Sequence, residues 1–312
     1  MSLLKFKEIK MKKIAIMAAL AFAATASLAQ VTLSGRIAEF VDSTKTGSTT
    51  VNSLVNDSSR VIVKAEETLG RGLTARVVID TTIAADDPKA GSATQIGDRQ
   101  STVGLVSKFG SIDLGRKEHS QYITSKNADP FMGTTYASIS PDVINDRSRR
   151  IGDAAFVGVN LGPVTASYDR SFYTSPTTAD ATAWSLSGKV GPVTAAVARF
   201  ETGVDYTNVV TLSGQVAGVT LSTIQSQDKS GTVETKGQLY GASVPVAGTP
   251  VTIKGSYGIK TGLTAGDVKA YNLGVNYAFS NRTSVLVAVR DVNTGGTASD
   301  VKQYGVGLIH SF

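Results

Sequence analysis

The sequence has no cysteine and only two histidines among its 312 residues, so it offers neither a disulfide nor the usual ligands of a zinc site. The signatures HExxH and GxSxG and the P-loop are also missing. His119 precedes Ser120, but neighbouring side chains on a strand face opposite ways, which argues against a nucleophile and its base. We therefore expect no metal, no cofactor and no enzymatic activity.

Long hydrophobic runs are scarce as well. Beyond residue 29 no segment approaches the roughly 18 consecutive apolar residues that mark a transmembrane helix. The run from Ile14 to Ala24 has eleven residues and follows Lys12 and Lys13, and residues 27–29 (SLA) have the small-x-small form of a cleavage site. This pattern predicts an export signal over residues 1–29, with Met11 as the natural start, and a mature chain over residues 30–312.

The basic charge of the sequence is mostly carried by this signal. The whole chain has 31 basic and 25 acidic residues, of which residues 1–29 hold five and one. That leaves 26 against 24, a net charge of +2, in the mature chain. We therefore expect no nucleic-acid partner.

Alternation of apolar and polar residues runs through the mature chain. It is clearest at 73–80, 251–260 and 271–279 and is typical of β-strands with one apolar face. Alternation alone fits both a water-soluble sandwich and a barrel whose apolar face meets lipid. An exported membrane protein without apolar helices must be a closed barrel, because lipid cannot satisfy open backbone groups.

The connections favour the barrel. Seven tight turns lie near 70–72, 110–111, 162–163, 191–192, 217–218, 247–250 and 280–282. Eight longer polar stretches fall between them, at 42–57, 81–97, 118–146, 173–181, 202–206, 227–233, 261–267 and 292–299. Short periplasmic turns that alternate with longer external loops are the pattern of outer-membrane barrels. Fifteen connections predict an all-β, 16-stranded antiparallel transmembrane β-barrel.

The third long stretch, 118–146, stands out by its length. Later turns, from 162 onward, follow one another at 27 to 32 residues, whereas 52 residues separate Gly110 from Gly162. Loops of this length are usually functional. Because a sixteen-stranded barrel has a wide aqueous lumen, we expect this loop to fold inward and narrow it.

Several segments carry a family resemblance. SRVIVK (59–64), GRGLTA (70–75), DRQ (98–100), VGL (103–105) and FGSIDLGR (109–116) resemble Gram-negative general porins. The opening VTLSG (31–35) also fits, and the ending YGVGLIHSF (304–312) resembles the betaproteobacterial branch. Residues 173–300 match in pattern only. The resemblance implies a homotrimer in the outer membrane, surrounded by lipid and lipopolysaccharide, that passes small hydrophilic solutes and ions by diffusion.

Strand alternation assigns basic residues to the lumen. Arg36, Arg60, Lys64 and Arg76 each oppose apolar neighbours and should point inward, as should Arg290. The alternative for each of these residues is a position near a rim of the barrel, where the charge is solvated by water. The alternation around Arg99 is blurred, but Arg99 resembles a basic position of the family. Of the three arginines 147, 149 and 150 after the third loop, we favour Arg149 as lumen-facing.

Acidic residues of the third loop should face this basic wall. They are Glu118, Asp129, Asp142 and Asp146. Opposed wall and loop charges create a transverse field that orients polar solutes and ions. The bases should slightly outnumber the acids, which predicts a mild preference for anions.

Two further residues are singled out by their positions. Arg116 shares a face with Ile112 and Leu114, so it should point outward while Asp113 and Lys117 point in. An outward arginine in lipid costs about 2–4 kcal/mol, so we expect a subunit contact, with snorkelling to the interface as the alternative. The terminal Phe312 resembles the signal that the barrel-assembly machinery reads.

Other functions fit the sequence less well. An outer-membrane adhesin or structural barrel would use large external loops, and here only the third is long. A barrel hydrolase would need a catalytic constellation, which the sequence lacks. A passive diffusion porin is the function that we expect.

Overall fold

The computed structural model describes residues 29–86, 95–131, 136–144, 148–172, 179–296 and 299–312. The predicted signal peptide lies outside the described residues apart from Ala29, as do Asp146 and Arg147. The first strands are β1 (Gln30–Thr46), β2 (Thr49–Asn56), β3 (Arg60–Gly70), β4 (Leu73–Thr82), β5 (Gln100–Ser107) and β6 (Gly110–Glu118). The rest are β7 (Arg150–Leu161), β8 (Val164–Ser171), β9 (Ala181–Val190), β10 (Val193–Thr202), β11 (Asp205–Val216), β12 (Val219–Ser230), β13 (Val233–Pro245), β14 (Val251–Thr261), β15 (Val268–Ala278), β16 (Thr283–Asn293) and β17 (Val301–Ser311).

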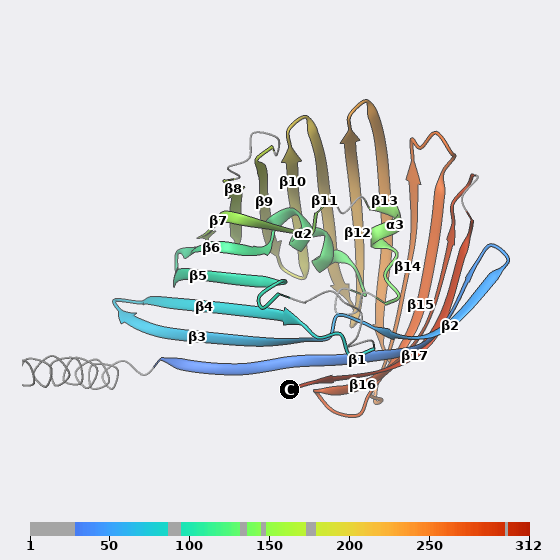
Figure 1. The fold of residues 1–312 in the computed structure, drawn as a ribbon, viewed down its shortest axis with the longest axis horizontal. Coiled ribbons are helices and arrows are strands. Elements are labelled where there is room, and N and C mark those ends of the chain that lie inside the picture. Colours follow the sequence, from blue (N-terminus) through green and yellow to red (C-terminus); the bar gives the residue numbers. More distant parts are fainter. Residues whose placement is uncertain (1–28, 87–94, 132–135, 145–147, 173–178, 297–298) are drawn as a thin grey trace, which may run out of the picture.

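These strands form a closed antiparallel barrel (Figure 1). From β3 onward each strand pairs with the next along the chain, and β1 closes the ring against β17, from Arg36 opposite Ser311 to Thr46 opposite Val301. The first half of β1 pairs with β3 and its second half with β2. β2 and β3 are therefore one strand, interrupted at residues 57–59, where Ser58 has a φ of 59°. Counted this way, the seventeen segments make the sixteen strands that the sequence predicted.

All seven predicted tight turns join consecutive strands, but three predicted loops are mostly strand. β1 and β2 meet at residues 47–48, β10 and β11 at 203–204, and β12 and β13 at 231–232. The sequence there is polar, which indicates contact with water but does not prevent strand pairing. Cross-strand hydrogen bonds satisfy the backbone on either side of these turns.

The outer surface of the barrel is apolar. Val103, Leu114, Leu212, Leu273 and Leu308 all lie on it, each about half exposed. Such a band is what the hydrocarbon of a bilayer contacts. Among the described residues, no helix has the length and apolar character needed to cross a membrane.

The packed interior lies between the wall and one inward segment, loop 3 (residues 119–149), which connects β6 to β7. It contains α2 (Ser120–Ala128) and α3 (Ser140–Val143), both inside the barrel (Figure 1). α2 packs against β8 to β12, and α3 against β13 to β15. Loop side chains such as Phe131, Ile139 and Ile144 are fully buried against the wall. Loop 3 therefore folds into the lumen, as expected.

Candidate functional site

The start of loop 3 is fixed by His119, which is fully buried. Its Nδ1 accepts a hydrogen bond from the Tyr122 amide (3.2 Å) and so caps α2, and Nε2 donates to the Ser148 carbonyl. The imidazole also stacks on Phe200, with ring centroids 4.4 Å apart. This histidine holds the entry and the exit of the loop together, and helix capping is the role that the structure gives it.

The second half of loop 3 is attached to the opposite side of the barrel. Tyr136 stacks on Phe40 at 4.1 Å, and its hydroxyl donates to Asp42. In α3, Asp142 accepts two hydrogen bonds, of 2.5 and 2.7 Å, from Arg290 on β16. A loop anchored at both ends divides the lumen into smaller spaces.

One of these spaces is a cavity of about 370 Å³ between α2 and the wall made by β3 to β7. We call it the cationic cavity. Six basic side chains line it, Arg60, Arg76, Arg99, Lys117, Lys126 and Arg150, together with three acids, Asp80, Asp113 and Glu118. The lining therefore has a formal excess of three positive charges.

Each acid of the cationic cavity lies between two bases. Asp113 contacts Arg76 (2.7 Å) and Lys117 (2.6 Å). Asp80 lies 3.5 Å from Arg99 and 4.0 Å from Arg60. Glu118 binds Lys126 (2.5 Å) and Arg150 (3.0 Å) in the same way. The acids hold the bases in place without neutralising them, so an entering anion meets a field that is positive overall.

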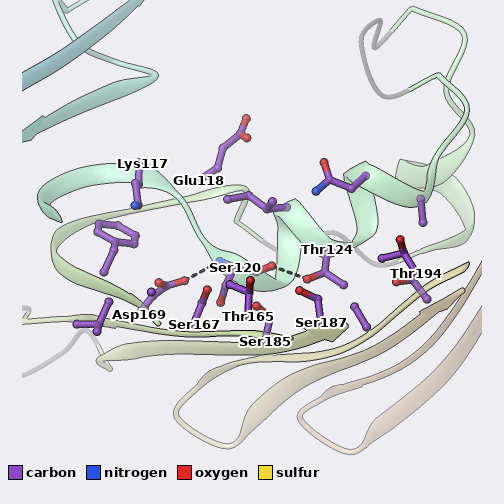
Figure 2. A pocket seen from close by; sticks show the side chains of 18 of the residues that line it. Lys117, Glu118, Ser120, Thr124, Thr165, Ser167, Asp169, Ser185, Ser187 and Thr194 are labelled. Atoms are coloured by element: carbon purple, nitrogen blue, oxygen red, sulfur yellow. Dashed lines mark hydrogen bonds between the residues drawn. The ribbon is translucent and has the colours of Figure 1, made fainter. Parts of the chain in front are cut away.

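A second cavity, of about 300 Å³, lies on the other side of α2 (Figure 2). We call it the hydroxyl cavity. The strand side chains Thr165, Ser167, Ser185, Ser187 and Thr194 face the helix there, and Asp169 accepts a 2.6 Å hydrogen bond from the Ser120 amide. Polar side chains thus cover the part of the lumen opposite the arginines.

Comparison with known proteins agrees with this architecture. A family model described as Gram-negative porin matches residues 15–312. The chain belongs to the Gram-negative porin family. The family identifies it as a passive outer-membrane channel and not an enzyme.

Solved porin structures share the fold. The anion-selective porin from Comamonas acidovorans has a TM-score of 0.74 at 21% identity, covering 91% of this chain and 100% of that chain. OmpF of Salmonella typhi, in complex with daunomycin, has a TM-score of 0.72 at 16% identity, with 91% and 98% covered. OmpT of Vibrio cholerae, in its trimer form, has a TM-score of 0.68 at 12% identity, with 91% and 99% covered. Among curated proteins none matches the chain.

The porin brings some of the predicted residues together. Arg60, Arg76, Arg99 and Glu118 all line the cationic cavity. Arg36 instead binds Asp57 at 2.8 Å, and both side chains are buried away from that cavity. Lys64 pairs with its neighbour Glu66 at 2.7 Å and is not part of the lining.

Arg150, not Arg149, lines the cationic cavity. The guanidinium of Arg149 lies 5.7 Å from the centroid of the Tyr122 ring instead. The prediction took this strand to start at residue 147, whereas β7 starts at Arg150. Alternation assigns faces only within a regular strand, so the preceding residues could not be assigned.

Two predicted loop acids have partners other than the basic wall of the cationic cavity. Asp142 is bound to Arg290, as described above. Asp129 is buried, and its carboxylate accepts hydrogen bonds from Ser138 Oγ (2.5 Å) and the Phe131 amide (2.9 Å). Burial raises the pKa of Asp129, although both hydrogen bonds oppose that shift. Asp129 therefore organises the loop and does not face the lumen wall as expected.

Five charged residues of the cationic cavity were not among the predicted site residues: Asp80, Asp113, Lys117, Lys126 and Arg150. Asp80 shares the face of Arg76 in the alternating segment 73–80, and Asp113 and Lys117 were assigned inward from their strand. A search for inward charges of both signs would have found these three. Lys126 lies in α2, where the strand pattern gives no information.

Acidification is expected to loosen the start of loop 3. Burial lowers the pKa of His119 from 6.5 to about 4, against the smaller effects of the Ser148 carbonyl and of Glu118. When the loop is released into water the imidazole regains its ordinary pKa, so between pH 6.5 and 4 the released state binds more protons. The docked state of loop 3 therefore has its full stability above pH 6.5. It loses about 3 kcal/mol of that stability as the pH falls from 6.5 to 4.

Single-channel recordings at pH 7 and pH 4 would check this. We expect open-channel noise to increase at pH 4. His119→Asn is the control, because asparagine still caps a helix but does not titrate. Equal acid-induced noise in the unmodified porin and in His119→Asn would contradict the prediction.

Proposed function

We propose that this porin is a general diffusion pore for ions and small hydrophilic solutes, with a mild preference for anions. The observation that supports it is the lining of the cationic cavity, in which six bases surround three acids. Four of the six are arginines, whose guanidinium stays protonated in proteins. Pores select through the charged groups that ring them, so this lining favours chloride, phosphate and carboxylates over cations.

The preference is mild because water screens the field. At 0.1 M ionic strength the Debye length is about 10 Å, and it falls to about 3 Å at 1 M. An anion at the centre of the cavity is thus attracted in dilute salt and hardly at all in concentrated salt. The name of the porin from Comamonas acidovorans, which describes it as anion-selective, is consistent with this proposal.

The proposed assembly is a homotrimer, the form named for OmpT of Vibrio cholerae. Arg116 is exposed on the outer face of β6, and its Nε donates to the Asp98 carbonyl at 2.9 Å. Gly152 beside it leaves room for the arginine. Burying this cation against another subunit avoids exposing it to lipid. The proposal also includes export with cleavage after Ala29 and folding by the barrel-assembly machinery. In the outer membrane, the porin contacts lipopolysaccharide.

Reversal potentials in a salt gradient test the anion preference. We expect a chloride-to-potassium permeability ratio above one in dilute salt that approaches one in concentrated salt. Replacing Arg99 and Arg150 by glutamine lowers the formal charge of the cationic cavity from +3 to +1, and the ratio should fall roughly twofold.

The matched control is the replacement of Arg71 and Arg282 by glutamine. Both lie at short turns outside the cationic cavity, so the same loss of charge should leave the ratio nearly unchanged. Cation selectivity of the unmodified porin would overturn the proposal.

A further inference from the structure

Lys254 lies on the inner face of β14, toward the short-turn end of the barrel. It is paired with Ser243 on β13 and with Gly274 on β15. It lines a third cavity, of about 240 Å³, together with the hydroxyls of Ser213, Ser222 and Ser243 and with Asn127 from α2. This space, the lysine cavity, is separate from the cationic cavity and shares no lining residue with it.

The ammonium group of Lys254 has room for an external partner. Within the described part of the chain it forms no ion pair. Asp129 also lines the lysine cavity, but its two carboxylate oxygens are bound to Ser138 and to the Phe131 amide. Burial raises the pKa of Asp129, while its two hydrogen bonds and the nearby charge of Lys254 act against that shift. Lys254 thus faces a cavity lined by hydroxyls, one amide and one carboxylate whose two oxygens already accept hydrogen bonds from loop 3.

The lysine cavity adjoins the hydroxyl cavity, which in turn adjoins the cationic cavity. It shares Asn127, Ala128 and Ser213 with the hydroxyl cavity. The hydroxyl cavity in turn shares Lys117, Glu118 and Ile123 with the cationic cavity. The three cavities follow one another around α2, which is the order in which an anion moving from the cationic cavity to Lys254 would meet them.

Strand register places hydroxyl side chains next to one another on the wall that leads to Lys254. Thr194 is opposite Ser213, and Ser213 is opposite Ser222. Thr220 is opposite Ser243, which is itself opposite Lys254. Hydroxyl groups donate hydrogen bonds to an anion without adding charge. They can solvate a passing anion without trapping it, which is what conduction through several weak sites requires.

We propose that Lys254 and its neighbouring hydroxyls form a second anion-binding step on the periplasmic side of loop 3. The ligands are small oxoanions, phosphate or a carboxylate, because an ammonium group flanked by hydroxyl and amide donors matches several oxygen acceptors at once. The inference rests on the proposed function, since it assigns the place where an anion pauses after the cationic cavity. The short turns beside Lys254 mark the periplasmic end of the barrel.

Block of chloride current by inorganic phosphate, added on the short-turn side of a planar bilayer, tests this step. In Lys254→Met we expect the half-blocking phosphate concentration to rise about fivefold, because a charge-assisted hydrogen bond is lost. Lys189→Met is the matched control. Lys189 continues the inward alternation of Ser185 and Ser187 but is exposed at the rim, and its loss should change the block less than twofold.

Two results would overturn the inference: unchanged block in Lys254→Met, or an equal change in Lys189→Met. If Lys254→Met does not assemble, the double variant Ser222→Ala with Ser243→Ala replaces it. We expect phosphate to block this variant less strongly than the unmodified porin, by a smaller change than in Lys254→Met. An unchanged block in the double variant would count against the site. Failure of the proposed function would look different, because the unmodified porin would then show no anion preference in the salt gradient.

Discussion

Replacing Gly237 by leucine is expected to raise the single-channel conductance of the porin by about two- to threefold, because loop 3 would leave part of the lumen. Gly237 lies on the inner face of β13, directly beneath α3. A Cβ atom at this position would lie 2.0 Å from the Val143 carbonyl oxygen and 2.5 Å from Ser226 Oγ. Neither distance is tolerable, so either the wall or the loop must move.

The loop is the part that gives way. β13 is held by continuous hydrogen-bonded pairing to β12 and β14, whereas α3 has only four residues. Overpacking a close contact costs about 1–3 kcal/mol and often more, which is comparable to what a few loop contacts contribute. Two other inner-wall glycines lie beneath loop 3 in the same way. A Cβ atom at Gly241 would lie 2.4 Å from Pro130, and a Cβ atom at Gly274 would lie 2.9 Å from Phe131. Glycine is therefore required at these three contacts between loop 3 and the wall.

Gly158→Leu provides the control. Gly158 is also an inner-wall glycine, but a Cβ there would lie 3.6 Å from Ser111 Oγ and would face the hydroxyl cavity. Its conductance should stay equal or fall slightly. Trimers on semi-native gels should be unchanged for both variants. A normal conductance in Gly237→Leu would show that the close contact at Gly237 does not hold loop 3 in the lumen.

The strands could be predicted from the sequence because their information is local. Period-two alternation gives the face of each residue, and the tight turns are marked by glycines such as Gly70 and Gly162, which have φ values of 88° and 66°. Such positive φ values are readily adopted only by glycine. Strand number and the inward direction of Arg60 and Arg76 follow from these two signals alone.

The path of loop 3 could not be predicted in the same way. Its length indicated that it folds inward, but its contacts are with strands distant in the sequence, as in the pair Asp142 and Arg290, which are 148 residues apart. Nothing near Asp129 in the sequence indicates that it is buried. Of the predicted loop acids, Glu118 lines the cationic cavity, Asp142 binds the wall residue Arg290, and Asp129 bonds within the loop itself.

Deleting Phe312 is expected to reduce the porin in the outer membrane roughly tenfold or more, since losing an aromatic anchor at a recognition site costs about 2 kcal/mol or more. The predicted reader is the barrel-assembly machinery. The stability of the finished barrel should hardly change. Phe312 closes the ring with two backbone hydrogen bonds to Gly35, of 2.9 and 3.1 Å, each worth about 1 kcal/mol.

The rest of the closure does not depend on Phe312. Pairing between β1 and β17 continues from Arg36 opposite Ser311 to Thr46 opposite Val301. Phe312 is 42% exposed, and its ring lies over Gly35, so a large part of its surface stays outside the packed closure. A large loss of the porin from the outer membrane, together with a small loss in the stability of the barrel, would distinguish a recognition role of Phe312 from a structural role.

Membrane fractionation of cells that express the truncated chain would measure the loss, with accumulation in the periplasm expected. Refolding of the purified chain in detergent should reach a yield close to that of the intact porin. Phe312→Tyr keeps the aromatic ring and should assemble normally. Normal outer-membrane levels of the truncated chain would refute the recognition role. A refolding yield that falls as far as the level in cells would instead make Phe312 a residue of the barrel closure.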